Sequence, residues 1–376
     1  MKRKVAFIIE SFSVGGAERA LVDIVNHLDL NKFNITIFSF YKHSVNLAYP
    51  FEIPRSELRE GVRFKYLVNN HNKLIYRIFG YLLNHYPTPV FRLFIGDKYD
   101  DVVGFYEGAP TRFVSKVRLR RGRKITWLQT SVELSQKGKN EDAIKAEGII
   151  YSAFDLIVSL SQGVKESFVS MFPNLRDKVT VAYHPMDMAK VVRLGDEPPI
   201  VQRPEIPLLV SVGRITWVKG HDRYLRVIDN LLKKGYRFEV WIIGGGDRTL
   251  LEEYCSKHNL DNVKFMGNQT NPFPFMKLAD WFVMPSYVEG FGSVQMEALA
   301  LGKAVISTKC SGTTELLGNS EYGLVVDNSE DSLQEGLEMV LSDEDLKFKY
   351  ESVAKERAKL FDIDACIRRI EEVLYV

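Results

Sequence analysis

The chain has few cysteines and almost no net charge, and each shortage excludes a class of protein. Among its 376 residues there are only three cysteines, Cys255, Cys310 and Cys366, and no two of them have the spacing of metal ligands. A sparse and odd number of cysteines excludes a scaffold built on disulfides and favours a reducing compartment. The 50 Lys and Arg residues nearly balance the 48 Asp and Glu residues, which leaves a formal net charge of +2. The total charge therefore identifies no partner.

Long apolar runs are also missing. The N-terminal run, Val5–Ile9, resembles the start of a signal peptide, but Glu10 interrupts it. It is too short for the hydrophobic region of such a peptide. No apolar run reaches the roughly 18 residues that a membrane-spanning helix needs. We therefore expect a cytoplasmic protein, and any contact with a membrane should be peripheral, at its inner face.

Short apolar runs alternate with longer amphipathic segments along the first half of the chain. Segments such as Glu18–Leu28 and Glu141–Phe154 have helical patterns. Strands that alternate with helices predict βαβ units and a parallel sheet. The strands predicted in this half are Val5–Ile9, Asn34–Phe40, Asp101–Tyr106, Ile125–Leu128, Asp155–Leu160 and Val179–Tyr183.

A proline-rich segment, residues 194–207, interrupts the alternation and is typical of a linker. Six further strands are predicted after it, within residues 208–213, 238–246, 263–267, 281–285, 304–308 and 324–326. We therefore predict an N-terminal Rossmann-like domain (1–193), a linker (194–207), a C-terminal Rossmann-like domain (208–360) and a closing helix (361–376). Two doubly wound α/β domains joined by one linker should place the carboxyl ends of their sheets across a cleft. Ligands bind at the carboxyl ends of such sheets, so the cleft is the expected site.

Two cations follow the first strand of the predicted second domain. The segment SVGRITWVKGHD (Ser211–Asp222) places Arg214 and Lys219 between a strand and a helix. Arginine offers a planar fork to phosphate and lysine a point charge, so both could bind an anion at the sheet edge. The alternative interpretation is an ordinary surface loop.

The segment EGFGSVQME, residues 289–297, places two glutamates eight positions apart around a glycine turn. The glycines allow close backbone approach, and we expect Ser293 to cap the helix that follows. The free N–H groups of that helix start suit a diphosphate. Glu297 could then accept hydrogen bonds from the two hydroxyls of a ribose, and Glu289 could hold sugar hydroxyls beyond the phosphates. The alternative is that both glutamates are solvated charges at helix ends.

The first domain supplies a second glycine turn. Gly15 and Gly16 lie between the first strand and the first helix, where small residues let a ligand approach the backbone. The sequence GGAERA at positions 15–20 does not match the dinucleotide fingerprint GxGxxG. A dinucleotide site is therefore not expected here.

Together these motifs resemble family 4 of the GT-B glycosyltransferases. The resemblance rests above all on the pair Glu289/Glu297, and also on Gly15-Gly16-Ala17-Glu18, Gly213-Arg214 and Lys219-Gly220. Two shorter segments, HPMD (184–187) and IIGGGD (242–247), are also similar to motifs of the family. It covers nearly the whole chain. It implies a retaining transferase that moves a sugar from a UDP- or GDP-sugar to a glycan or lipid-linked acceptor in cell-surface polysaccharide biosynthesis.

The resemblance also implies roles for individual residues. Arg214 and Lys219 would bind the diphosphate, Glu297 the ribose, and Glu289 the donor sugar near its anomeric carbon. These assignments make Glu289, Arg214 and Lys219 the candidate catalytic residues. The backbone of the turn Gly290-Phe291-Gly292 and of Ser293 would contact sugar and phosphate, and Gly16 would lie against the donor from the other domain.

The sequence predicts neither a cofactor nor a catalytic metal, because cations and helix dipoles can neutralise the charge that develops on the leaving phosphate. Asp343-Glu344-Asp345 and Asp362-Ile363-Asp364 match Asp-x-Asp, but both lie far from the predicted sheet-edge loops. We expect turn and helix-cap roles for them. The family often has a histidine after the strand that corresponds to Ile125–Leu128; here Gln129 stands there, a candidate contact to sugar or acceptor that cannot titrate.

The acceptor side is less regular. The segments Arg112–Lys124, which is densely basic, and Lys73–Ile95, which mixes aromatics, leucines and cations, could rest on an anionic membrane surface. The alternative is a core helix beside a solvated basic face. No nucleic acid is expected as a partner, since no binding module for it is apparent. For the whole chain, the alternative function is a nucleotide-sugar-binding or epimerase-like GT-B protein without transferase activity.

Overall fold

The computed structural model describes residues 1–12, 16–42, 53–69, 72–130, 140–198 and 201–375. The chain divides into two compact units, Met1–Pro185 with Ile363–Val376, and Met186–Asp362. Within the described residues, no helix is long and apolar enough to cross a membrane.

The first unit contains a seven-stranded parallel sheet in the order β3-β2-β1-β4-β5-β6-β7. Its strands are β1 (Arg3–Ile9), β2 (Phe33–Tyr41), β3 (Arg63–Val68), β4 (Asp101–Phe105), β5 (Arg123–Leu128), β6 (Leu156–Ser159) and β7 (Val179–Val181). Its α-helices are α1 (Gly16–His27), α2 (Lys73–His85), α3 (Pro87–Phe94), α4 (Ala109–Lys116), α6 (Glu141–Ser152), α7 (Gln162–Met171) and α16 (Ile363–Tyr375). Short 3₁₀ turns lie at Arg55–Glu57 and Pro173–Lys178.

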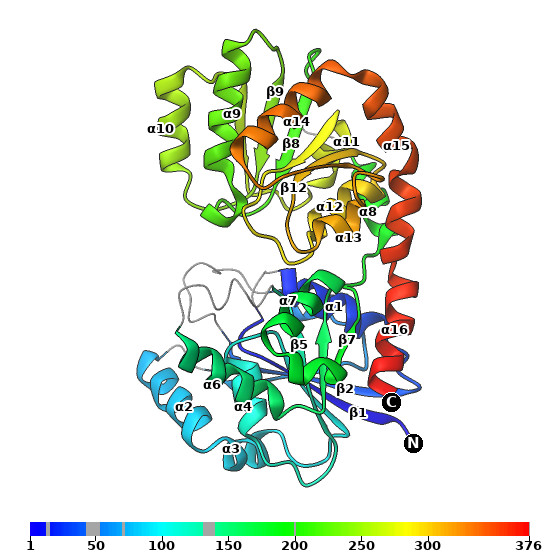
Figure 1. Cartoon of the computed structure of the whole chain (residues 1–376). Helices are drawn as coiled ribbons and strands as arrows, with labels where there is room; N and C mark the ends of the chain where they lie inside the picture. Colours follow the sequence, from blue (N-terminus) through cyan, green and yellow to red (C-terminus); the bar gives the residue numbers. More distant parts are fainter. Residues whose placement is uncertain (13–15, 43–52, 70–71, 131–139, 199–200, 376) are drawn as a thin grey trace. The chain divides into compact units, whose positions relative to one another are not determined.

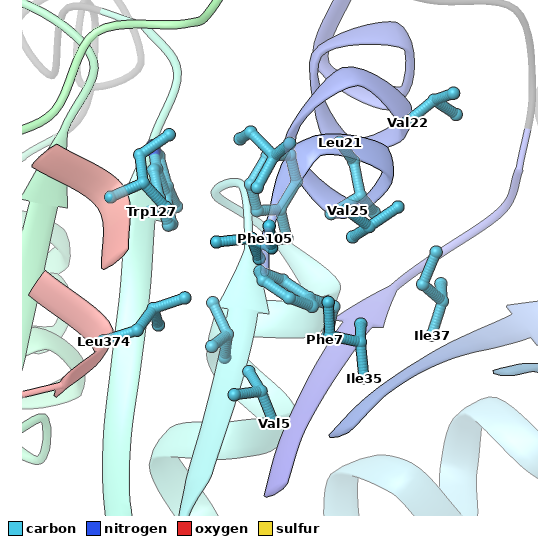
Figure 2. Packing of buried hydrophobic residues seen from close by; sticks show 14 of the residues in the cluster. Val5, Phe7, Leu21, Val22, Val25, Ile35, Ile37, Phe105, Trp127 and Leu374 are labelled. Carbon is cyan, nitrogen blue, oxygen red and sulfur yellow. The ribbon is translucent and has the colours of Figure 1, made fainter. Parts of the chain in front are cut away.

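Alternation along the strands places one core on each face of this sheet. Val5 and Phe7 of β1 face α1 and α16, where they pack with Leu21, Val25 and Leu374 (Figure 2). The intervening residues of β1 point to the opposite face, which α4 covers. The helix α16 therefore returns from the end of the chain to complete the core of the first unit.

The second unit contains a six-stranded parallel sheet in the order β10-β9-β8-β11-β12-β13. Its strands are β8 (Leu208–Val212), β9 (Glu239–Ile243), β10 (Val263–Gly267), β11 (Trp281–Met284), β12 (Ala304–Thr308) and β13 (Leu324–Val326). Its α-helices are α8 (Met188–Gly195), α9 (His221–Lys233), α10 (Thr249–His258), α11 (Phe273–Leu278), α12 (Ser293–Ala300), α13 (Thr313–Leu317), α14 (Glu330–Ser342) and α15 (Glu344–Ala358). Short 3₁₀ turns lie at Trp217–Lys219 and Lys359–Phe361 (Figure 1).

The prediction of two Rossmann-like α/β domains with parallel sheets is confirmed. The division between the units falls between Pro185 and Met186, whereas the sequence prediction continued the first domain to residue 193. The reason is α8, which begins before the predicted linker 194–207, ends within it, and packs against α11 and α12 of the second unit.

One strand, β3, was not predicted. It is an edge strand in which the exposed Arg63 and Lys65 alternate with the half-buried Phe64 and Tyr66. Such alternation is the weaker signal of a strand with one solvated face, whereas most of the predicted strands are apolar runs buried on both faces.

Candidate functional site

The strand order of the second unit determines where a ligand would bind. The chain runs from β8 outward through β9 to β10, then returns to the other side of β8 and continues through β11 to β13. Adjacent strands β8 and β11 thus lead to helices that leave in opposite directions, which opens a crevice at their carboxyl ends. The loops after these two strands, residues 213–220 and 285–292, contain most of the predicted site residues.

Two backbone hydrogen bonds fix the loop after β8 to the end of β9 and the residues that follow it. The Gly213 N–H donates to the carbonyl of Ile243 (2.9 Å), and the Ile215 N–H donates to that of Gly245 (2.8 Å). At its end Gly220 adopts the left-handed conformation, φ 65°, and occupies the N-cap of α9. A Cβ atom at Gly220 would lie 2.0 Å from the Pro285 carbonyl oxygen. Only glycine therefore allows the two loops to approach this closely.

Backbone contacts then join the two loops. The N–H groups of Tyr287 and Val288 both donate to the carbonyl of Val218, at 2.8 and 3.3 Å. This contact brings Lys219 beside Glu289, and Lys219 Nζ donates to Glu289 Oε2 at 2.5 Å. The pair is mostly buried, with 19% and 18% of the two side chains exposed. The structure therefore places together two of the three predicted catalytic residues.

Arg223, on the first turn of α9, binds the backbone of the loop after β11. Its guanidinium is buried and donates to the carbonyls of Pro285 (2.9 Å) and Ser286 (2.7 Å), and also to Thr308 Oγ1 (3.2 Å). It also lies over the ring of Tyr287, 4.1 Å from its centroid. Burial lowers the pKa of Arg223 from its ordinary value. The sequence prediction missed this residue, because nothing in the pattern of α9 distinguishes a buried arginine from a surface one.

The turn Gly290-Phe291-Gly292 leads into α12, but Ser293 does not cap that helix. The N-cap is Gly292, in the left-handed conformation with φ 91°, and it makes no side-chain cap hydrogen bond. Ser293 is already the first helical residue, so its hydroxyl is not in position to accept from the next turn. The prediction of a serine cap is therefore wrong, and no side chain caps the start of α12.

Two further contacts fix this turn. A Cβ atom at Gly312 would lie 2.4 Å from Phe291 Cα and 2.8 Å from the Gly290 carbonyl oxygen, so the chain after β12 packs directly against the turn. Inside α12, the buried Gln295 donates through Nε2 to Ser307 Oγ at 2.6 Å. The start of α12 is thus tied to the sheet beneath it.

The remaining predicted residues of the second unit lie on the same elements. Arg214 is exposed on the loop after β8, and Glu297 is partly exposed within α12. His221, next to Lys219 in space, is buried, and its Nε2 lies 3.5 Å from Ser211 Oγ. Burial first and Lys219 second lower the pKa of His221 to about 4. A neutral imidazole therefore adjoins the cation.

Gly16 and Gln129, the other predicted contacts, belong to the first unit. Gly16 is the first residue of α1 and is exposed, and none of the described residues would obstruct a Cβ atom there. The fold of this unit therefore does not require glycine at that position. Gly15 lies outside the described residues.

Gln129 follows β5 and is held by a carboxylate that the sequence prediction did not select. Its backbone N–H and that of Thr130 donate to Glu107 Oε1, at 2.8 and 3.0 Å. Burial raises the pKa of Glu107. The Gln129 Nε2 atom is buried and has no hydrogen-bond partner among the described residues. The neighbouring Tyr106 has a positive φ of 88°, and its hydroxyl accepts from the Glu10 N–H at 2.8 Å.

A metal site was not predicted, and the described residues contain no group of three or more His, Cys, Asp or Glu side chains that could hold a metal ion. Asp343, part of the Asp-Glu-Asp match, caps α15 by accepting from the Leu346 N–H at 3.0 Å. Its predicted helix-cap role is confirmed.

Comparisons with known proteins identify similar sequences and structures. Residues 197–360 match the family described as "Glycosyl transferases group 1". An N-acetylgalactosaminyltransferase of Campylobacter jejuni that acts on N-acetylgalactosamine-N,N'-diacetylbacillosaminyl-diphospho-undecaprenol is 30% identical over 220 residues, which are 57% of this chain and 58% of the relative. CapM of Staphylococcus aureus, a glycosyltransferase of capsular polysaccharide biosynthesis, is 30% identical over 36% of this chain and 37% of its own.

Solved structures resemble the chain over its full length. Anabaena HepE in complex with UDP has a TM-score of 0.75 at 17% identity and covers 100% of both chains. The lipopolysaccharide outer core galactosyltransferase WaaB has a TM-score of 0.74 at 17% identity and covers 99% of both chains. At these identities the likeness establishes the fold. Residues 197–360 are therefore similar to the group 1 glycosyltransferases, and the chain as a whole has the GT-B fold.

Proposed function

We propose that the protein is a retaining glycosyltransferase that moves a sugar from a UDP- or GDP-sugar to a glycan or lipid-linked acceptor in polysaccharide biosynthesis. The observation that carries the proposal is the pair Lys219 and Glu289 at the β8–β11 crevice, beside the uncapped start of α12. A cation, free N–H groups and a carboxylate within one crevice can receive a diphosphate and the sugar attached to it.

Each group then has a role in the proposed reaction. Lys219 and Arg214 bind the diphosphate, and the start of α12 adds backbone N–H groups and the positive end of its dipole. Glu289 accepts hydrogen bonds from the sugar, and Glu297 accepts from the ribose. As the bond between sugar and phosphate breaks, negative charge develops on the leaving phosphate, and these preorganised cations and dipoles stabilise it.

The comparisons support the proposed substrate classes. HepE was solved with UDP and with UDP-glucose, and the Campylobacter relative is named for a lipid-linked acceptor. The chain spans 58% of the length of that relative. The donor and the acceptor of this chain are therefore proposals to be tested.

Calorimetry with UDP and GDP, followed by transfer assays on a panel of sugar nucleotides, tests the proposal. Glu289→Ala should abolish transfer and leave nucleotide affinity within about threefold of wild type. Glu297→Ala should instead weaken nucleotide binding by about tenfold or more, the loss expected for hydrogen bonds to a charged group. Glu253, exposed on α10, gives the matched control variant Glu253→Ala. Nucleotide binding without turnover of any sugar nucleotide would favour a binding protein over a transferase.

Metal independence is part of the proposal, because cations of the chain supply the charge that a metal would otherwise provide. Transfer should continue at an unchanged rate after dialysis against a chelator. A rate that falls with the chelator and returns with Mg²⁺ or Mn²⁺ would contradict this part of the proposal and leave the transferase assignment intact.

We further propose that the sugar is transferred with retention, by attack of the acceptor on the face that the diphosphate leaves. The anomeric configuration of the product, read by NMR from its one-bond coupling, tests this directly. An inverted product would contradict the retaining assignment.

A further inference from the structure

The helix α2 has two apolar faces, and its own unit uses only one of them. Phe79 and Leu83, one turn apart, are buried against the first unit. Leu74, Ile78 and Tyr81, spaced by four and three residues, form a second apolar stripe, and Leu74 is 61% exposed. This spacing places all three on one side of the helix. A helix that only completed the core of its unit would need no such second stripe.

The exposed stripe continues onto α3. Tyr86 lies between the two helices, and Leu93 near the end of α3 is 79% exposed. The rings of Phe79 and Phe94 meet edge to face, 5.7 Å apart, and join the helices. Figure 1 shows α2 and α3 at the periphery of the first unit. We call the exposed side chains Leu74, Ile78, Tyr81, Tyr86 and Leu93 the α2–α3 face.

An open apolar groove adjoins this face. It has a volume of about 400 Å³ and lies between the end of β3 and α2. Its lining includes Leu67, Ile75, Ile78, Leu82 and Phe94. The apolar surface of the α2–α3 face is therefore continuous with a recess that could take hydrocarbon.

The charged side chains of α2 are all basic, whereas Arg92 of α3 forms an ion pair with Asp97 at 3.4 Å. Residues 61–96 contain no Asp or Glu, but they include Arg63, Lys65, Lys73, Arg77 and Arg92. Lys73 and Arg77 are exposed on α2, on the flank of the apolar stripe. This combination of an apolar face with a cationic flank is typical of a helix that lies in a membrane interface.

The basic segment Arg112–Lys124 contributes to this surface only in part. The Arg118 N–H donates to Thr88 Oγ1 at 2.9 Å, and Lys116 Nζ donates to the Asn84 carbonyl at 3.3 Å, so both residues lie at the junction of α2 and α3. In contrast, Arg120 and Arg121 form ion pairs with Asp97 and Asp100. Arg118 is therefore a better candidate for contact with an anionic surface than its two neighbours.

We propose that the α2–α3 face docks on an anionic lipid bilayer. Apolar side chains would enter the boundary of the acyl chains, Tyr81 and Tyr86 would lie at the level of the headgroups, and the cations would meet the anionic lipids. A symmetric dimer through the same face would bring cations against cations, which favours the bilayer over a second copy of the chain. The inference does not depend on the proposed function.

Cosedimentation of the full chain with vesicles, without donor or acceptor, tests the proposal. Binding should be strong to phosphatidylcholine vesicles that contain phosphatidylglycerol, weak to pure phosphatidylcholine, and lowered by salt because salt screens exposed charges. The double substitution Leu74→Ser/Ile78→Ser should weaken binding by about tenfold or more. Leu250→Ser, at a residue that is 79% exposed on α10 of the second unit, is the matched control and should have no effect.

A second pair of variants tests the charge component. Arg77→Glu and Arg118→Glu should each weaken binding to the anionic vesicles by at least about fivefold, the factor expected when one cation near such a leaflet is lost. Lys257→Glu, on α10, is the control. Unchanged melting temperatures and unchanged nucleotide affinity would show that the variants are folded. Absence of vesicle binding by the wild type, or equal binding by the α2 variants and the Leu250 control, would overturn the proposal. So would a dimer in solution that Leu93→Ser converts to a monomer without any effect on vesicle binding.

Discussion

Lys219 Nζ lies 2.5 Å from Glu289 Oε2, across 70 residues of sequence and between the loops that follow adjacent strands. Because both side chains are mostly buried, the cation compensates a carboxylate that would otherwise be costly to place there. In the proposed reaction the same lysine binds the diphosphate. The pair therefore holds the carboxylate proposed to bind the sugar beside the cation proposed to bind the diphosphate.

Lys219→Met should weaken the binding of UDP or GDP by about 10- to 100-fold, since the variant loses a charge-assisted hydrogen bond to phosphate. Titration calorimetry measures this directly. Lys257→Met, at an exposed position of α10, controls for the loss of a positive charge elsewhere. If Lys219→Met lowers the melting temperature but leaves nucleotide affinity unchanged, the lysine serves only the ion pair.

Gly220→Ala should destabilise the second unit and lower nucleotide affinity. The new Cβ atom would lie 2.0 Å from the Pro285 carbonyl oxygen, so the two loops would have to separate. Gly235→Ala provides a matched control: φ is also positive there, at 91°, but none of the described residues lies within 4 Å of the added atom. Both variants carry the left-handed cost of about 1–2 kcal/mol. Only Gly220→Ala should lose more than this in urea unfolding and should also lose affinity.

Features whose cause is local in the chain could be predicted from the sequence. The mainly apolar runs predicted twelve of the strands, and most of these are buried in the two parallel sheets, although β10 and β13 are only partly buried. The Glu289–Glu297 segment was placed correctly at the start of a helix because its glycines and the following periodicity are adjacent in sequence. Ser293 shows the limit: a serine before an apolar run is a strong cap signal, but the left-handed Gly292 starts the helix one residue earlier.

Features that depend on contacts distant in sequence could not be predicted. Arg223 was not selected because its hydrogen bonds to Pro285 and Ser286 span 62 and 63 residues. Glu107 was not selected because its acceptor role depends on the pairing of β4 with β5, which brings Gln129 beside it. The direct contact of Lys219 with Glu289 likewise requires the pairing of β8 with β11. The sequence predicts a parallel sheet in this domain but not the contact between these two side chains.

Arg223→Met should destabilise the second unit by about 2–4 kcal/mol, because it leaves the buried carbonyls of Pro285 and Ser286 without their donor. Denaturant unfolding measures the loss. Arg223 acts on the reaction through the loop that carries Glu289, so the turnover rate should fall more than nucleotide affinity. Arg223→Lys, which keeps the charge and one donor group, should recover part of the rate. Arg237→Met, at an exposed arginine, is the control. Equal losses of rate for the Met and Lys variants at unchanged stability would contradict a positioning role.

The stability of the second unit should fall as the pH decreases from about 6.5 to about 4, and His221 should account for part of the fall. Its pKa is lowered from 6.5 to about 4 by burial first and by Lys219 second, with Asp222 acting in the opposite direction. In this pH window the unfolded chain binds a proton that the folded chain does not, so unfolding becomes more favourable as the pH decreases. A shift of this size corresponds to about 3 kcal/mol at most. His221→Gln should therefore make the dependence of the unfolding free energy on pH shallower between these limits, while His85→Gln, at an exposed histidine of α2, should leave it unchanged.

His184 of the first unit has the same lowered pKa for the same reason, so its substitution should act on that unit alone. Hydrogen exchange, which reports each unit separately, distinguishes the two contributions. An unaltered slope in His221→Gln would mean that this imidazole binds protons alike in the folded and the unfolded chain, so that its pKa is not lowered by folding.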